Sequence, residues 1–144
     1  MIPNVEIRDT GPSKGRGVFA APEFQAGEVV EICAAIVFRC PFDDLPKELQ
    51  ELAFCWSGLA GLSEPHMQAI ALGYGGLYNS KNPANMRYEA VAGTPHPLLR
   101  FIAVRTIQSG EELTVNYSAI GGGPESDESN DNRWFEKKNI TYVD

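Results

Sequence analysis

The stretch GYGGLYNSKNPANMRY, residues 73–88, decides how the rest of the chain is organised. It holds three glycines within four positions, three tyrosines, three asparagines and a proline, which suits neither a regular helix nor an ordinary central strand. Asn79 and Asn85 lie on either side of Pro83, and asparagine amides hydrogen bond readily to nearby backbone. The stretch therefore predicts a folded loop where the chain crosses itself. From these residues alone, a solvated turn with aromatic neighbours is the alternative.

The composition indicates one globular domain. A chain of 144 residues, 43% of them hydrophobic, can bury a single sizeable core. The formal charge of −7, from 19 acidic and 12 basic residues, disfavours a protein that binds nucleic acid by neutralising its phosphates. It favours a basic protein or peptide as the partner.

No segment is long and apolar enough to predict a membrane span, and the first residues, MIPNVEIRDT, lack the pattern of a secretory signal. We therefore expect an intracellular protein without membrane contact, cytoplasmic or, in a eukaryote, nuclear. Cys33, Cys40 and Cys55 are odd in number and never spaced as Cys-x-x-Cys. Reduced thiols packed as small hydrophobes are favoured over a disulfide or a metal site.

The hydrophobic pattern predicts short strands joined by glycine and proline turns. The expected strands are residues 5–8, 18–20, 28–38, 98–104 and 111–117. In the last of these, Leu113, Val115 and Tyr117 alternate with polar residues and are expected on one face. The chain therefore reads as a β-rich α+β domain.

One region changes period. From Asp44 to Trp56 the apolar residues recur at helical spacing, which predicts a helix capped by Asp44 with Trp56 as a core anchor. Residues 63–72 are expected to be looser and partly helical. Residues 40–72 together form a predicted helical insert.

The C-terminal part divides into two predicted segments. Residues 121–132 are rich in glycine, serine and acidic residues and predict a flexible acidic linker. Residues 133–144 contain the adjacent aromatics Trp134 and Phe135, which predict a flanking segment that docks on the domain.

Three separated segments together resemble the SET-domain protein-lysine methyltransferases. Residues 14–20, with Gly-Arg-Gly-Val-Phe-Ala, resemble the family's first signature. Residues 77–88 resemble its Asn-His-Ser-x-x-Pro-Asn segment and the tyrosine that follows. Residues 110–117, Gly-Glu-Glu-Leu-Thr-Val-Asn-Tyr, resemble its Gly-Glu-Glu-Leu-x-x-Asp-Tyr ending. The segments have the family's order and spacing across residues 3–118, whereas Gly-x-Gly alone is more typical of a plain glycine turn.

The resemblance implies an α+β, mainly β fold: the SET fold, with small curved β-sheets around a C-terminal pseudoknot and one inserted helical segment. The domain would span residues 1–120. S-adenosylmethionine would bind on one face and leave as S-adenosylhomocysteine, and a protein lysine would enter from the other face. The chemistry requires no metal.

The resemblance also implies roles for individual residues. Backbone groups of Gly15, Arg16 and Gly17 would hold the cofactor, Asn79 would bond its amino-acid end, and the backbone of Ser80 would meet its adenine. The full set of predicted cofactor-binding residues is Lys14, Gly15, Arg16, Gly17, Tyr74, Tyr78, Asn79, Ser80 and Trp134.

Two further tyrosines are implied at the reacting groups. Tyr117 would be the catalytic tyrosine, and Tyr88 would line the lysine channel. A methyl on sulfonium is already activated, so the protein's task is to align a neutral amine with it. Lysine has a pKa near ~10.4 in water, and an apolar channel favours its neutral form.

This sequence departs from the family pattern at several positions. Ser80 stands where the family has histidine, Asn116 stands for aspartate, and Ala84 stands for proline, with Pro83 one place earlier. No cysteine follows Cys55, so the zinc-binding segment of many relatives is not expected. Trp134 or Phe135 would close the site in its place, or would only cover the core. The departures leave two other functions open: a SET-like binding module without chemistry, and an unrelated β-rich ligand-binding domain.

Overall fold

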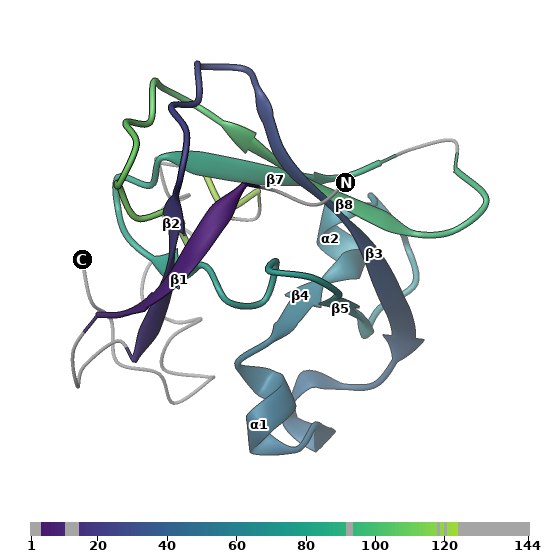
Figure 1. Ribbon diagram of the computed structural model, residues 1–144. Helices are drawn as coiled ribbons and strands as arrows, with labels where there is room; N and C mark the ends of the chain where they lie inside the picture. Colours follow the sequence, from purple (N-terminus) through teal and green to yellow (C-terminus); the bar gives the residue numbers. More distant parts are fainter. Residues whose placement is uncertain (1–3, 11–14, 92–93, 118, 120, 124–144) are drawn as a thin grey trace.

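The computed structural model describes residues 4–10, 15–91, 94–117, 119 and 121–123 (Figure 1). The strands are β1 (Val5–Asp9), β2 (Arg16–Ala20), β3 (Val29–Arg39), β4 (Ala53–Cys55), β5 (Met67–Ala71), β6 (Asn79–Ser80), β7 (Met86–Ala90), β8 (Leu98–Ala103) and β9 (Thr114–Val115). A 3-10 turn (Phe42–Asp44) and the one-turn helices α1 (Lys47–Gln50) and α2 (Trp56–Leu59) lie between β3 and β5. Within these residues no helix has the length and apolar character needed to cross a bilayer.

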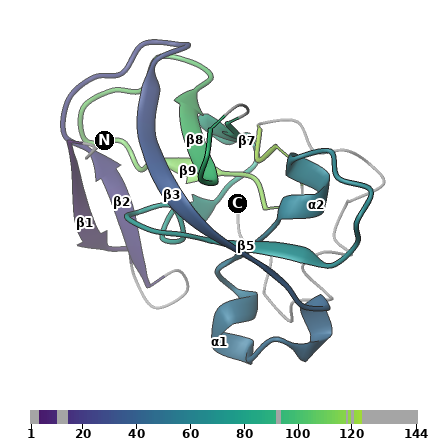
Figure 2. The ribbon, with the colours of Figure 1, turned by 90° about the vertical axis from the view of Figure 1, so that its right-hand side faces the viewer.

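The strands form three sheets. β1 and β2 make an antiparallel hairpin, and five strands form an antiparallel sheet in the order β4-β5-β3-β8-β7. β6 and β9 pair in parallel. β3 is the long curved strand of the large sheet (Figure 2). Its first half pairs with β8 and its second half with β5, with a register irregularity between Val29 and Glu31. This mainly β architecture confirms the predicted fold class.

One hydrophobic core joins the hairpin to the large sheet. Its fully buried members include Val18, Val30, Ala69, Met86, Leu99, Phe101, Ile107 and Leu113. Two isolated bridges, Phe19 with Glu112 and Phe24 with Ile107, tie the segment after β8 to the hairpin and the turn that follows it. The C-terminal part of the domain is thereby brought against the N-terminal part.

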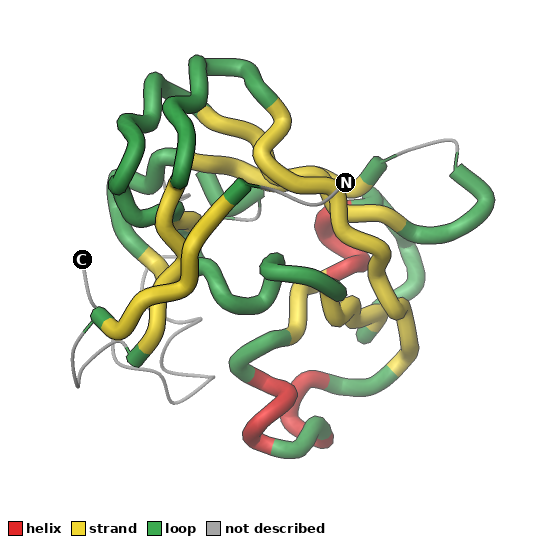
Figure 3. The backbone as a smooth tube through the Cα atoms, in the orientation of Figure 1, coloured by secondary structure: helices red, strands yellow, loops and turns green. Residues whose placement is uncertain are grey.

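The predicted helix from Asp44 to Trp56 is wrong (Figure 3). A single helical turn forms at α1, and the chain then extends as β4, whose residues pair with β5 at the edge of the large sheet. The hydrogen bonds of that pairing outweigh a helical apolar spacing, because tertiary contacts override weak local propensity. Residues 67–71, expected to be partly helical, are strand β5. Trp56 is buried, as predicted for a core anchor.

The strand predicted over residues 111–117 is also much shorter than expected. Only Thr114 and Val115 form β9, and Leu113, Thr114, Val115 and Asn116 are all buried. The expected alternation between a buried and an exposed face fails because both sides of this segment are covered by protein.

Gly121 and Gly122, the first two residues of the predicted linker, are hydrogen bonded to the domain. The Gly121 carbonyl accepts a 2.8 Å hydrogen bond from the Tyr88 N–H, and the Gly122 carbonyl accepts one of 2.7 Å from the Asn116 N–H. These glycines are therefore packed against the domain. Lys14, Trp134, Phe135 and residues 124–144 lie outside the described residues.

The three cysteines are free thiols. Cys33 is buried, Cys40 is half-buried and Cys55 is exposed, so the prediction that they pack as small hydrophobes is confirmed only for Cys33.

Candidate active site

Residues 112–117 cross beside residues 79–85. β6 and β9 pair in parallel there. Asn85, which is 2% exposed, is hydrogen bonded through its side chain to two residues of the crossing segment. Its Nδ2 donates to the Glu112 carbonyl at 2.8 Å, and its Oδ1 accepts from the Thr114 N–H at 2.9 Å. Because these bonds join distant parts of the chain, they confirm that the stretch quoted first is a folded crossing and not a solvated turn.

Asn79 connects this crossing to the first glycine segment. Its Nδ2 donates to the Arg16 carbonyl at 3.1 Å and to Glu112 Oε2 at 2.6 Å. A Cβ added to Gly17 would lie 2.4 Å from Glu112 Oε2 and 3.1 Å from Asn79 Nδ2. Only glycine therefore permits this approach. We call Arg16, Gly17, Asn79 and Glu112 the glycine–asparagine junction.

The junction offers a donor and an acceptor side by side. An amide group can donate to a carboxylate, and the Glu112 carboxylate can accept from an ammonium. Once a ligand takes the place of the bond between them, this pair complements a zwitterionic amino-acid group. Gly15, with φ +71°, has nothing within 4 Å of an added Cβ, so its side of the segment is open. Sequence reasoning missed Glu112, although its place in Gly-Glu-Glu was a usable signal.

Tyr117 is hydrogen bonded to the two residues that flank Asn79 in the sequence. Its hydroxyl donates to the Tyr78 carbonyl at 2.5 Å, and its N–H donates to Ser80 Oγ at 3.1 Å. The serine that replaces histidine therefore has a defined partner in this chain. Tyr117 thus meets the same loop that carries Asn79.

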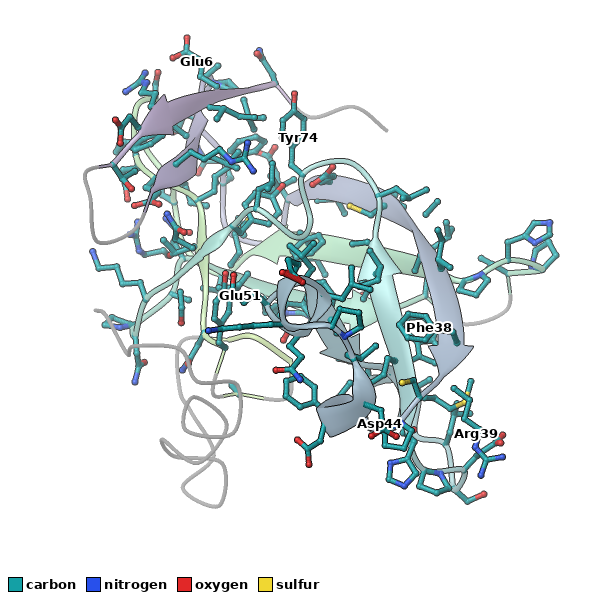
Figure 4. All side chains as sticks on the ribbon, turned by 90° about the horizontal axis from the view of Figure 1, so that it is seen from below. Glu6, Phe38, Arg39, Asp44, Glu51 and Tyr74 are labelled. Atoms are coloured by element: carbon teal, nitrogen blue, oxygen red, sulfur yellow. The ribbon has the colours of Figure 1, made fainter. Side chains whose placement is uncertain are left out.

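The environment of Tyr117 keeps its hydroxyl protonated. Burial raises its pKa to about 12, and the nearby carboxylates of Glu51, at the end of α1 (Figure 4), and Glu112 add to the rise. At neutral pH the group is a neutral phenol, whose proton is directed at the Tyr78 carbonyl. Its oxygen lone pairs can then accept a hydrogen bond from a ligand.

Tyr88 belongs to an aromatic cluster made of Phe54, Tyr78, Tyr88 and Phe101. The Tyr88 ring packs edge-on against Phe54 with centroids 5.0 Å apart, and lies 5.7 Å from Phe101. Burial first, and then the Tyr117 phenol, raises the pKa of Tyr88. Phe54 was not anticipated, because it fell inside the predicted helix.

The side chain of Tyr78, a predicted cofactor-binding residue, is held in the core, and the predicted contact stays a prediction for its backbone. Its hydroxyl donates to Glu31 Oε1 at 2.6 Å, and only 1% of the residue is exposed. The group that Tyr78 presents to the site is its carbonyl. Tyr74 rises from the loop after β5 (Figure 4), and its N–H donates to Glu31 Oε2 at 2.9 Å. Its ring remains a predicted cofactor contact, and Glu31 was not anticipated at all.

In the part of the chain that the structure describes, no group of three His, Cys, Asp or Glu side chains could hold a metal ion. Lys14 and Trp134 keep their predicted cofactor roles as predictions, since they lie outside those residues.

Comparisons with known proteins agree with this geometry. The family model described as SET domain matches residues 15–118. A histone-lysine N-methyltransferase of Schizosaccharomyces pombe, H3 lysine-37 specific, is 27% identical over 135 residues, covering 92% of this chain and 77% of that protein.

Two solved structures share the fold. A Plasmodium falciparum protein assigned as a histone methyltransferase superposes with a TM-score of 0.63 at 21% identity, covering 81% of this chain and 95% of that chain. A chain of a humanized Chaetomium thermophilum Polycomb Repressive Complex 2, bound to an inhibitor, gives 0.64 at 19% identity. That match covers 87% of this chain but only 16% of the other.

Proposed function

Since this chain belongs to the SET domain family, we propose that it transfers a methyl group from S-adenosylmethionine to the ε-amine of a lysine in a protein. The observation that carries the proposal is the meeting of three distant segments at one crossing. Asn79 bonds to the Arg16 carbonyl beside Gly17, and Tyr117 bonds to the residues on either side of Asn79.

The junction suits the amino-acid end of S-adenosylmethionine. In this proposal the cofactor replaces the bond between Asn79 and Glu112: Asn79 Nδ2 then donates to its carboxylate, Glu112 accepts from its ammonium, and the backbone of residues 15–17 lies along it. The absence of a Cβ at Gly17 is the structural support, because an added Cβ would lie 2.4 Å from Glu112 Oε2 and would displace that carboxylate from Asn79. When bound, the cofactor supplies a methyl group already activated by a positive sulfur.

The aromatic cluster and Tyr117 suit the amine. Lysine reacts only as the neutral amine, and apolar surroundings disfavour its charged form. Phe54 and Tyr88 supply such surroundings. The Tyr117 hydroxyl donates its hydrogen bond to the Tyr78 carbonyl. The Tyr117 oxygen can therefore accept a hydrogen bond from the amine N–H, which turns the nitrogen lone pair toward the methyl carbon.

The substrate is proposed from charge and from one relative. The chain carries a formal charge of −7, which favours association with lysine-rich proteins. The S. pombe relative is named for a histone H3 lysine. We therefore infer a histone-like basic protein as the substrate.

Radiolabelled methyl transfer tests the function. Purified protein is incubated with methyl-labelled S-adenosylmethionine and core histones, and label in the histones is expected. Replacing histones by acetylated histones is the matched control and should remove the signal. Binding of S-adenosylhomocysteine without any transfer to histones or to a mixed basic-protein pool would instead support a binding module. Absence of both binding and transfer would refute the proposed site.

A further inference from the structure

A buried carboxylate lies beneath the loop that carries Asn79. Glu31 is on β3 and is 2% exposed. Its two oxygens accept from two different places in the loop: Oε1 from the Tyr78 hydroxyl at 2.6 Å, and Oε2 from the Tyr74 N–H at 2.9 Å. A buried carboxylate is costly unless its oxygens are hydrogen bonded, and here both are.

The loop is shaped around this carboxylate. Gly73 has φ +78°, and a Cβ there would lie 2.5 Å from Glu31 Oε2. A Cβ on Gly75 would lie 3.1 Å from both Cys33 Sγ and Phe101 Cε2. Glycine at position 73 lets the backbone approach the carboxylate, and glycine at position 75 lets the loop pack on the core. Both ends of residues 74–78 are hydrogen bonded to the Glu31 side chain.

The same loop ends at the reactive groups. The Tyr78 carbonyl receives the Tyr117 hydroxyl, and the next residue, Asn79, reaches the Arg16 carbonyl and Glu112. Two hydrogen bonds therefore connect Glu31 to Tyr117 through Tyr78. The first joins residues 47 positions apart in the sequence, and the second joins residues 39 positions apart.

The geometry points to Glu31 as a positioning residue, which holds residues 73–79 so that the Tyr78 carbonyl orients Tyr117 and the Asn79 amide reaches the glycine segment. The inference rests on the proposed function. The competing view is that Glu31 contributes only to folding, like any well-bonded core residue.

Two substitutions at Glu31 separate these views. In Glu31→Gln, the amide oxygen can accept from the Tyr74 N–H, and the amide nitrogen can donate to the Tyr78 hydroxyl oxygen. Glu31→Leu has a similar size but leaves both loop groups unpaired. Ile107→Ala is the matched control, because Ile107 is fully buried in the core and contacts the turn at Phe24.

The kinetic experiment compares these variants at a temperature where all are folded. We expect Glu31→Leu to lower kcat at least about tenfold while KM for the histone stays close to wild type, because a misplaced group costs rate more than binding. Glu31→Gln should recover most of kcat. A Glu31→Leu enzyme with the kcat of the Ile107→Ala control would overturn the inference.

A second readout does not need turnover. In protein labelled with ¹³Cζ-tyrosine, assigned by Tyr117→Phe, the Tyr117 resonance should shift in Glu31→Leu and stay near its wild-type position in Glu31→Gln and Ile107→Ala. An unchanged Tyr117 resonance in Glu31→Leu would refute the positioning role even if wild type is active. A wild-type protein that transfers no methyl would refute the proposed function instead, and the resonance would still test the contact from Glu31 to Tyr117.

Discussion

The hydroxyl of Tyr117 donates to the backbone carbonyl of Tyr78 at 2.5 Å. This contact fixes the direction of the phenolic proton, since a carbonyl can only accept. In the proposed reaction this oxygen would act as a hydrogen-bond acceptor toward the substrate, and burial keeps the phenol neutral.

Tyr117→Phe should lower methyl transfer by about 10²-fold, because it removes a positioned hydroxyl from the reacting amine. The affinity for S-adenosylhomocysteine should stay unchanged, since Asn79 and Glu112 are intact. Steady-state transfer to histones and calorimetric titration measure the two quantities. A fully active Tyr117→Phe variant would show that the hydroxyl has no part in the reaction.

Gly17→Ala should weaken S-adenosylhomocysteine binding by about tenfold or more while the protein remains folded. The added Cβ would lie 2.4 Å from the end of the Glu112 side chain, which can turn aside but then leaves Asn79. Gly123→Ala is the control, because its Cβ would make only an ordinary 3.8 Å contact with Arg87. Equal affinities for the two variants would contradict the role given to the junction.

Asn79→Asp should lower the free energy of unfolding by roughly 1–3 kcal/mol, because a carboxylate would replace the amide that donates to Glu112 at 2.6 Å. Adding Glu112→Gln should recover part of the loss, since the new amide can donate to the new carboxylate. Urea denaturation of wild type, both single variants and the double variant measures this coupling. Strictly additive changes would mean that the two side chains do not interact.

Gly122→Ala should displace the Tyr88 ring, lower methyl transfer and destabilise the protein. Gly122 has φ +68°, and a Cβ there would lie 2.0 Å from the ring. The neighbouring Gly121→Ala is the control, with a 3.6 Å contact to the Tyr88 carbonyl. Thermal unfolding and transfer assays on the pair decide the point: similar behaviour of both variants would rule out a specific contact at residue 122.

The free energy of unfolding should fall as the pH rises from about 9 to 12. Burial, aided by Glu31, raises the pKa of Cys33 from 9.0 to about 12, and burial raises that of Tyr117 from 10.0 to about 12. In this window the unfolded chain releases protons that the folded protein keeps, so alkali favours unfolding. Cys33→Ala should reduce the decrease of the free energy of unfolding with pH between pH 9 and 10, where the tyrosines contribute least to that decrease.

Urea denaturation at a series of pH values measures the slope of that decrease. Cys55→Ala is the matched control, because Cys55 is exposed, and its slope should equal that of wild type. A Cys33→Ala variant with the wild-type slope would show that the buried thiol does not carry the effect.

The resemblance carried by three short motifs predicted the fold and the meeting of Gly17, Asn79 and Tyr117. It succeeded because the structure requires particular residue types at these positions. Gly17 lies where an added Cβ would meet Glu112, and the Asn79 amide donates to both the Arg16 carbonyl and Glu112. Strands β3 and β8 were also predictable, because both are long apolar runs rich in residues that favour extended structure.

Local patterns failed where tertiary pairing decided the structure. The spacing of Leu49, Leu52 and Trp56 fits a helix, yet residues 53–55 gain their hydrogen bonds from β5. The role of Glu31 was hidden for the same reason. A single carboxylate inside an apolar run was visible, but the loop that satisfies it lies more than 40 positions away, with Tyr78 at a separation of 47.

The crossing of residues 112–117 beside residues 79–85 can form only after most of the domain has been synthesised. The contacts that fix Tyr117 span 37 and 39 positions, and contacts so distant in sequence form late because the intervening chain must first be ordered. A chain still emerging from the ribosome, with residue 117 not yet synthesised, has its glycine segment and Asn79 but lacks Tyr117. Under the proposed function, such a chain cannot transfer a methyl group before residue 117 has been added and the crossing has formed.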